Sequence, residues 1–143
     1  MSPNHQISVQ VDDSERWYVD GKLHRTDGPA VEYADGTKVW YVDDKCHRLD
    51  GPAVENKDGT KEWYVDDKLH RLGGPAFEWA NGDNEWYVDG KLHRTDGPAI
   101  EWANCDNEWY VDGNQFETID AWAEYLGIID TPEFVLMKLK YSG

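Results

Sequence analysis

The stretch WYVDGKLHRTDGPAVEYADGTKV, from Trp17 to Val39, recurs along most of the chain and decides its fold. Three further copies follow it without any insertion, and a fifth copy begins with WYVDG and then departs from the pattern. The copies span residues 17–39, 40–62, 63–85 and 86–108, with the partial copy at 109–113, so the period is 23 residues. Such a period is typical of an array in which each unit packs on its neighbours.

Each unit contains two short runs of residues that favour β-strands, separated by turn residues. The first run is Trp-Tyr-Val, and the second is Ala-Val-Glu-Tyr or a variant of it. Between the second run and the next Trp-Tyr-Val stand Asp35-Gly36, Asp58-Gly59 and Asn81-Gly82, which suit tight hairpin turns. In the fourth copy the dipeptide is Asn104-Cys105, and we expect the cysteine to strain or reshape the turn. The class is therefore mainly β: an elongated, single-layer antiparallel meander of β-hairpin repeats.

Side chains alternate between the two faces of a strand, which leads to a prediction about the faces of this sheet. We place the tryptophans on one face with the Val/Phe/Ile column and most of the Tyr/Trp column, and the tyrosines and glutamates on the other. The Val/Phe/Ile column is Val31, Val54, Phe77 and Ile100. Aromatic columns stacked between successive hairpins would then stabilise the array. The connection DGKLHRTDGP is expected to be irregular, because Gly28-Pro29 interrupts a regular ladder.

The ends of the array are predicted to differ from its middle. Residues 1–16 form an N-terminal half-repeat with a strand at 6–11, where apolar and polar residues alternate. In residues 114–143 the pattern changes to helical spacing, with Thr118 and Gly127 bounding a first helix and Thr131-Pro132 starting a second. We predict that this two-helix cap covers the last hairpin. The alternative is that the helices present an amphipathic surface for a partner or for dimerisation.

The chain is strongly acidic, with 14 Lys and Arg against 29 Asp and Glu and a net charge of −15. This charge argues against binding to duplex nucleic acid or to anionic membranes, which requires clustered basic residues. It either keeps an aromatic-rich sheet soluble or attracts a basic partner. The N-terminal residues lack the pattern of a signal peptide, and no apolar stretch is long enough to span a membrane. Cys46 and Cys105 occupy different parts of the unit, so we expect no disulfide and a cytoplasmic location.

The residue types and their spacing give little indication of a catalytic or metal site. His24, His47, His70 and His93 form a column, but successive members are about 9.6 Å apart, too far to share one ion. We therefore predict no metal and no other cofactor, and a structural role for these histidines through hydrogen bonds to backbone or Asp. There is no nucleophile motif and no phosphate-binding loop, so the chain is not expected to be an enzyme. Cys46 is interpreted as a small hydrophobic residue under a loop.

The frame W-Y-x-D-G-K-x-H-x-x-D-G-x-A-x-x-Y-A-D-G-T resembles the MORN repeat over residues 17–113. The variant WYVDGKLHRTDGPA is similar to repeats found in bacteriophage and giant-virus proteins. This resemblance implies an open meander of β-hairpins that contacts other macromolecules. The chain departs from the MORN frame where arginines replace the glycine after each histidine, and it lacks the basic surface that MORN-type lipid binding requires.

The leading hypothesis is a non-enzymatic, acidic protein-binding module. The resemblance adds that it is a phage or viral accessory protein that inhibits a host defence protein, by surface occlusion or polyanion mimicry. The partner would be a basic or nucleic-acid-binding host protein, contacted by an exposed tyrosine face and the acidic C-terminal segment. The residues expected to make these contacts are Tyr18, Tyr41, Tyr64, Tyr87, Tyr110, Glu101, Glu108 and Asp112.

Two alternatives remain open at this point. In the first, the chain sequesters a nucleotide signal along the Lys-x-His-Arg edge, with phosphates held by Arg25, Arg48, Arg71 and Arg94. The simpler interpretation of these arginines is that each pairs with an Asp or Glu of its own or the next repeat. In the second alternative, the chain is a structural virion or scaffold component. A homodimer through the C-terminal helices or the sheet edges is compatible with each hypothesis.

Overall fold

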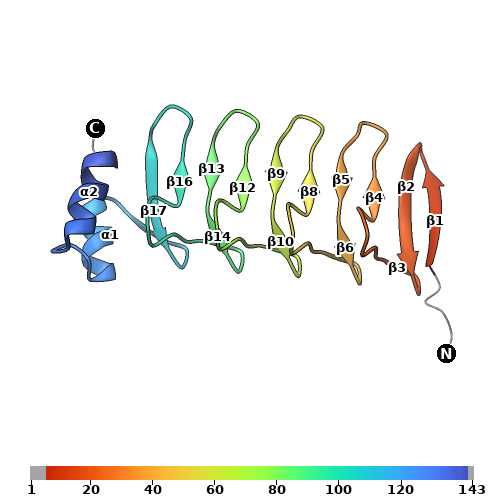
Figure 1. Ribbon diagram of the computed structural model, residues 1–143, viewed down its shortest axis with the longest axis horizontal. Helices are drawn as coiled ribbons and strands as arrows, with labels where there is room; N and C mark the ends of the chain where they lie inside the picture. The colour runs from red at the N-terminus through yellow and green to blue at the C-terminus, as the bar shows by residue number, and fades with distance from the viewer. Residues whose placement is uncertain (1–5, 142–143) are drawn as a thin grey trace.

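A computed structural model describes residues 6–141 and shows a row of β-hairpins followed by two helices (Figure 1). The strands of the main sheet are β1 (Gln6–Val11), β2 (Ser14–Val19), β3 (Lys22–Leu23), β4 (Val31–Glu32), β5 (Lys38–Val39), β8 (Val54–Glu55), β9 (Lys61–Glu62), β12 (Phe77–Glu78), β13 (Asn84–Glu85), β16 (Ile100–Glu101), β17 (Asn107–Val111) and β18 (Asn114–Phe116). These 12 strands run in the order β1-β2-β4-β5-β8-β9-β12-β13-β16-β17-β18, with β3 paired to β2 beside this path. The predicted antiparallel meander is confirmed.

The repeats contain a second kind of hairpin that the sequence analysis missed. Three small two-stranded sheets are formed by β6 (Tyr41–Val42) with β7 (Lys45–Cys46), β10 (Tyr64–Val65) with β11 (Lys68–Leu69), and β14 (Tyr87–Val88) with β15 (Lys91–Leu92). The turn between β6 and β7 is Asp43-Asp44, with φ of 48° and 66°. Two successive positive φ angles match a type I′ turn, and Asp tolerates them better than most residues. The connection predicted to be irregular therefore begins with a hairpin, and each unit has turns at both ends (Figure 1).

The predicted turns at the other end of the units are confirmed. Gly36, Gly59 and Gly82 have φ between 96° and 99°. Cys105 also has a positive φ, 73°, and its backbone N–H donates to the Trp102 carbonyl at 2.9 Å, as Gly82 does to Trp79 at 3.0 Å. The cysteine therefore does not reshape the turn. It occupies the left-handed region, which disfavours residues with a Cβ atom.

The register of the sheet corrects the predicted assignment of faces. Phe77 lies directly opposite Glu62 and Glu85, so these three side chains share a face. Trp63 follows Glu62 in the chain and points to the other side, which separates the tryptophans from the Val/Phe/Ile column. The tryptophan face carries Trp17, Trp40, Trp63, Trp86, Trp109, Glu32, Glu55, Glu78 and Glu101. The tyrosine face carries the Val/Phe/Ile column, the five repeat tyrosines and Glu62, Glu85 and Glu108.

Burial in the array is local to each unit and to its neighbours. The alanine that begins each second strand run is fully buried in all four repeats, at Ala30, Ala53, Ala76 and Ala99. The prediction that aromatic columns stack between successive hairpins is wrong. Within residues 6–141, the ring contacts are the Phe77–Trp79 pair and three pairs at the C-terminal end. The tryptophans of the repeats are covered by arginines, as described below.

The C-terminal helices are α1 (Ile119–Leu126) and α2 (Pro132–Tyr141), and both begin at the predicted caps. The Thr118 hydroxyl accepts a hydrogen bond from the Ala121 N–H at 3.0 Å, and Gly127 ends α1 with φ of 75°. The helices pack on β17 through a cluster of buried residues: Trp109, Val111, Trp122, Ala123 and Phe134. The predicted cap on the last hairpin is confirmed.

At the other end, β1 pairs with β2 along its whole length, which confirms the strand predicted at 6–11. Residues 1–5 of the predicted half-repeat lie outside the described residues. Ile7 and Val9 are 48% and 37% exposed on this terminal strand. The array therefore has different ends: helices cover one, and a strand edge forms the other.

Candidate protein-binding surface

The five repeat tyrosines are half-buried, whereas the prediction placed them on an exposed face. The Tyr64 hydroxyl donates to Glu62 at 3.3 Å, and the Tyr87 hydroxyl donates to Glu85 at 3.5 Å. Burial and the adjacent carboxylate raise the pKa of Tyr64 and of Tyr87 to about 12. These rings are part of the packing of the sheet, and their contact with a partner stays a prediction.

The exposed aromatic residues of the tyrosine face stand in a different column. Tyr33 is 41% exposed and Trp79 is 43% exposed, at the ends of their second strand runs. The Trp79 ring stacks on Phe77 with the ring centroids 4.3 Å apart, which holds it against the sheet. Sequence reasoning did not select these two residues, because it assigned their column to the tryptophan face.

The three predicted acidic contact residues do not form one surface. Ile100 lies opposite Glu108 in the sheet, so Glu101 and Glu108 point to opposite faces. Glu101 accepts from Arg94 at 3.0 Å and from Tyr141 at 3.1 Å. Glu108 accepts from the Trp102 indole at 2.7 Å. Both carboxylates therefore fasten neighbouring elements of the array, while Asp112 lies in the hairpin turn that follows β17.

Each of the four repeat arginines lies over the tryptophan of its own unit. The distances from the guanidinium carbon to the ring centroid are 4.2, 3.9, 4.0 and 3.8 Å for the pairs Arg25–Trp17, Arg48–Trp40, Arg71–Trp63 and Arg94–Trp86. At this distance the cation is attracted to the face of the ring. An arginine therefore stands beside each of these four tryptophans, where the prediction placed another aromatic ring.

The polar groups of these arginines are also engaged. Arg48 Nε donates to Asp50 at 2.9 Å, and Nη1 donates to the Pro52 carbonyl at 3.0 Å. Arg25 and Arg94 repeat both bonds, whereas Gly73 stands at the aspartate position beside Arg71. The predicted pairing of arginines with acidic residues is confirmed, with Glu78 as the acidic partner of Arg71 at 3.4 Å. An anion bound by the three aspartate-paired arginines would compete with these carboxylates.

The histidine column joins each repeat to the next. Nδ1 of His24, His47, His70 and His93 accepts a hydrogen bond from the backbone N–H of the aspartate 19 residues later, at 3.0–3.2 Å. The predicted structural role is confirmed. In the described part of the chain, no three His, Cys, Asp or Glu side chains lie close enough together to hold a metal ion.

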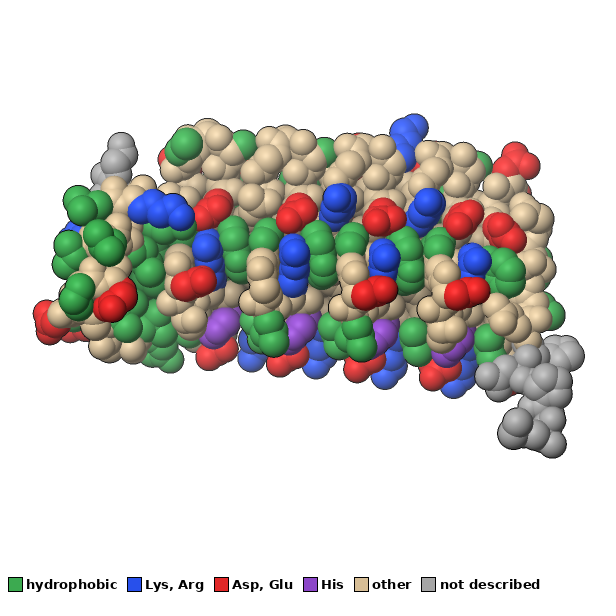
Figure 2. All heavy atoms as spheres, viewed as in Figure 1, with side chains coloured by type: hydrophobic (Ala, Val, Ile, Leu, Met, Phe, Trp, Pro, Cys, Tyr) green, Lys and Arg blue, Asp and Glu red, His purple; other side chains and the backbone are tan. Residues whose placement is uncertain are grey.

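The hairpin turns whose backbone N–H groups donate to the histidines carry a regular row of exposed carboxylates. The side chains of Asp43, Asp66, Asp89 and Asp112 are 67%, 70%, 77% and 68% exposed. Because the units share the same geometry, this turn-aspartate row has one carboxylate in each unit from the second to the fifth. Rows of acidic, basic and histidine side chains run along the array in Figure 2.

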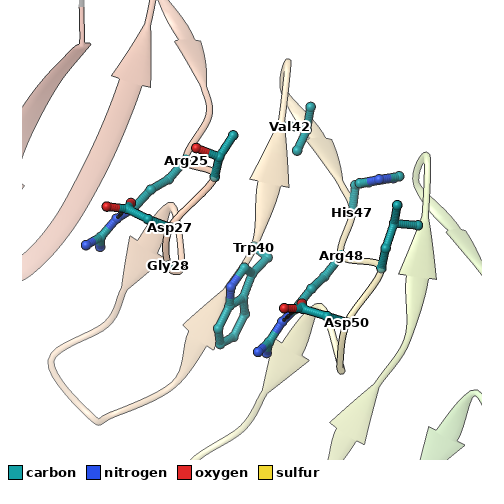
Figure 3. Close-up of a pocket in the computed structure, with 10 residues that line it drawn as sticks. Arg25, Asp27, Gly28, Trp40, Val42, His47, Arg48 and Asp50 are labelled. Atoms are coloured by element: carbon teal, nitrogen blue, oxygen red, sulfur yellow. Dashed lines mark hydrogen bonds and ion pairs between the residues drawn. The ribbon is translucent and has the colours of Figure 1, made fainter.

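Shallow grooves lie between the connections of consecutive repeats on the tryptophan face. The first has a volume of 510 Å³, with Trp40 and Val42 between the connections that start at Arg25 and at His47 (Figure 3). The second, of 590 Å³, contains Trp63 and Val65, and the third, of 710 Å³, contains Trp86 and Val88. Leu49 and Leu72, which are 80% and 82% exposed, stand at the rims. We call these the three repeat grooves.

The two cysteines are free and lie in different environments. Cys46 belongs to the buried cluster with Val31, Val39 and Ala53, as predicted for a small hydrophobic residue. Burial, with a smaller contribution from Asp67, raises the pKa of the Cys46 thiol to about 12. Cys105 is exposed at the left-handed turn position.

No protein-family model matches the chain, and no curated protein is significantly similar to it. The fold is a repeated antiparallel β-hairpin meander with short strands, consistent with a MORN-like repeat architecture. None of the helices within residues 6–141 combines the length and apolar content that crossing a bilayer requires. The basis for assigning a function is therefore the surface of the array itself.

Proposed function

We propose that the chain is a non-enzymatic protein-binding module whose acidic surface contacts a basic protein. The turn-aspartate row is the observation that carries this proposal. Its carboxylates are exposed, and the histidine bonds fix the backbone of the turns that hold them. A net charge of −15 adds a long-range field that favours encounter with a positively charged surface.

A rigid row of this kind suits binding by occlusion. Each turn is bonded to the preceding repeat, so little conformational freedom remains to be lost when a partner is bound. The array would lie along a basic surface and cover it. A partner that normally binds nucleic acid would then encounter a row of carboxylates in place of phosphates.

The narrower proposal concerns origin and target. The resemblance of the WYVDGKLHRTDGPA frame to MORN-like repeats of bacteriophage and giant-virus proteins supports a viral accessory role. In this proposal the partner is a host defence protein in the cytoplasm, and the chain inhibits it by surface occlusion or polyanion mimicry.

The test is affinity capture from host cells with the native chain and with the triple variant Asp43→Asn, Asp66→Asn and Asp89→Asn. Asn keeps the size of Asp and also tolerates the left-handed conformation, so the variant removes the negative charge and keeps the shape of the turn. Each exchanged oxygen lies 3.3 Å from the Nδ1 of the histidine that holds the turn, so thermal unfolding of the variant is measured alongside. We expect a stoichiometric partner that the native chain retains, that the variant retains poorly, and that heparin displaces. Equal recovery by both proteins, or no partner at all, would contradict the proposal.

A further inference from the structure

The fifth, partial unit shows what can cover a repeat tryptophan other than an arginine. Counting from Trp109 as from the earlier tryptophans, Phe116 stands at the histidine position and Glu117 at the arginine position. The ring of Trp109 is contacted instead by Trp122 of α1, with ring centroids 4.6 Å apart, and by the edge of Tyr141 of α2, with ring centroids 5.5 Å apart. As a result Trp109 and Val111 are only 7% and 4% exposed, whereas the corresponding Trp40 and Val42 are half-buried.

Trp122 also reaches the preceding repeat. Its indole N–H donates to the backbone carbonyl of Arg94 at 3.2 Å, 28 residues earlier in the chain. Trp122 itself is fully buried. The indole therefore joins three features of the fold: a repeat tryptophan, the valine two residues after it, and the arginine carbonyl of the unit before it.

The same three features recur in each repeat groove. The tryptophan and valine are Trp40 and Val42, then Trp63 and Val65, then Trp86 and Val88. The preceding arginines are Arg25, Arg48 and Arg71, and within residues 6–141 no hydrogen bond to their carbonyl oxygens is seen. Volumes of 510–710 Å³ fall within the range of about 300–1,000 Å³ common for ligand sites.

We propose that the three repeat grooves bind tryptophan side chains presented by a helical segment of the partner protein, as α1 presents Trp122 to the last unit. This inference rests on the proposed protein-binding function and names what the partner presents. An indole would gain apolar contact with Leu49 and Leu72 and a hydrogen bond to an arginine carbonyl. Tryptophan is also among the residues that contribute most binding energy at protein interfaces.

The spacing of the grooves restricts the partner further. Consecutive grooves are separated by two antiparallel strands, which is about 10 Å. Residues i and i+7 of an α-helix are about 10.5 Å apart and lie on the same side. One helix with tryptophans at i and i+7 would therefore reach two neighbouring grooves.

The probe for this inference is a synthetic alanine- and lysine-rich helix with fluorotryptophan at i and i+7. The control peptide has leucine at both positions and the same charge. Binding to the full chain is measured by calorimetry and by the ¹⁹F line width of the peptide. We expect saturable binding that is at least about tenfold tighter than that of the control.

The matched protein variants alter only the exposed groove rims. The variant with Leu49→Glu and Leu72→Glu should bind the tryptophan peptide about tenfold more weakly than the native chain does. The variant with Leu49→Met and Leu72→Met should bind it with the affinity of the native chain. Both leucines are more than three-quarters exposed, so these changes should leave the thermal unfolding midpoint almost unchanged. Equal affinity for both peptides, or no effect of the glutamates, would overturn the inference.

Three further results distinguish the failure of this inference from the failure of the proposed function. If the NMR signals of AMP broaden in the presence of the chain and the ¹⁹F signals of the tryptophan peptide do not, the grooves accept nucleobases and the inference falls. If the captured partner is lost with the asparagine variant but not with the rim variant, the protein-binding function stands and the inference falls. If neither variant changes capture, both are wrong.

Discussion

His47 of the second repeat accepts, through Nδ1, a hydrogen bond from the backbone N–H of Asp66 in the third repeat, at 3.1 Å. The bond fixes a turn in which both central residues have positive φ. Its loss in His47→Ala should destabilise the array by about 1 kcal/mol, because the N–H then lacks its acceptor. His47→Asn, whose side-chain oxygen can accept in a similar place, should recover part of the loss. Urea unfolding followed by tryptophan fluorescence measures both, and equal loss in the two variants would contradict this role.

Arg48 is expected to matter more for stability than its ion pair with Asp50. Arg48→Ala removes the contact with the Trp40 ring and the hydrogen bond to Pro52, with an expected cost of about 1–2 kcal/mol. Asp50→Gly recreates the arrangement of the third repeat, where Gly73 stands beside Arg71, and should cost less than about 0.5 kcal/mol. Urea denaturation of the two variants gives the free energy of unfolding that each one loses. A larger loss for Asp50→Gly than for Arg48→Ala would contradict the prediction.

Cys105→Gly is predicted to stabilise the fourth repeat. Cys105 has φ of 73°, and glycine adopts this conformation without steric cost. The gain is offset by the greater freedom of glycine in the unfolded chain, so the net increase should be up to about 1 kcal/mol. Cys105→Ala keeps the Cβ atom and should give no increase. A gain in the alanine variant equal to that in the glycine variant would show that the left-handed turn is not the cause.

Trp122→Ala should detach the helical cap without unfolding the repeats. The side chain is fully buried against Trp109, so its removal should cost about 3–5 kcal/mol locally. In an array each unit depends mainly on its neighbours, so the loss should stay near the C-terminal end. Hydrogen exchange should show faster exchange in α1 and α2 and unchanged protection in β4 and β5. Faster exchange throughout the sheet would contradict local loss.

Stability should fall in alkaline solution because of two half-buried phenols, those of Tyr64 and Tyr87. The pKa of Tyr64 and of Tyr87 is raised to about 12, against 10.0 for an exposed tyrosine. The folded chain therefore holds these protons more tightly than the unfolded chain. Their contribution is complete below pH 10 and is lost as pH rises toward about 12.

The measurement is the free energy of unfolding in urea as a function of pH. The native chain should lose more stability above pH 10 than the variant with Tyr64→Phe and Tyr87→Phe. Absorbance of the tyrosinate form should rise at lower pH in unfolded than in folded protein. Parallel pH profiles for the native chain and the variant would show that these two phenols do not govern the alkaline loss.

Much of the fold follows from local chemistry that the sequence displays. Asp35-Gly36 and its equivalents predict one set of turns, and Thr118 and Gly127 predict the bounds of α1, because each acts through bonds to nearby backbone. The faces of the sheet depend on register instead. Alternation along the strand places Phe77 and Trp79 on the same face of the sheet. Only the pairing of Phe77 with Glu62 and Glu85 shows that this is the face away from Trp63 and its equivalents in the other repeats.

The candidate site was less predictable for the same reason. Asp43-Asp44 is a weak sequence signal for the second hairpin because Asp-Asp is a rarer turn dipeptide than Asp-Gly, although the first copy has Asp20-Gly21 at that position. The hairpin turns the chain back, which brings Arg48 over the Trp40 ring. A sequence analysis that lacks this hairpin predicts neither that contact nor the grooves beside it. The sequence shows that Phe116 and Glu117 replace the histidine and arginine of the repeat in the fifth copy. It does not show that Trp122 packs on Trp109 there, which depends on the tertiary structure.

Each histidine accepts a hydrogen bond from the following repeat, so every junction between repeats is built in the same way. The number of repeats can therefore change without a change in the fold of each one. Deleting or duplicating one 23-residue segment in phase would leave every remaining junction of the same kind as before. Recombination within the gene could therefore lengthen or shorten the molecule in whole steps without a new fold. The reach of the protein along a target would then evolve by counting units, and its surface chemistry would evolve separately by substitution within them.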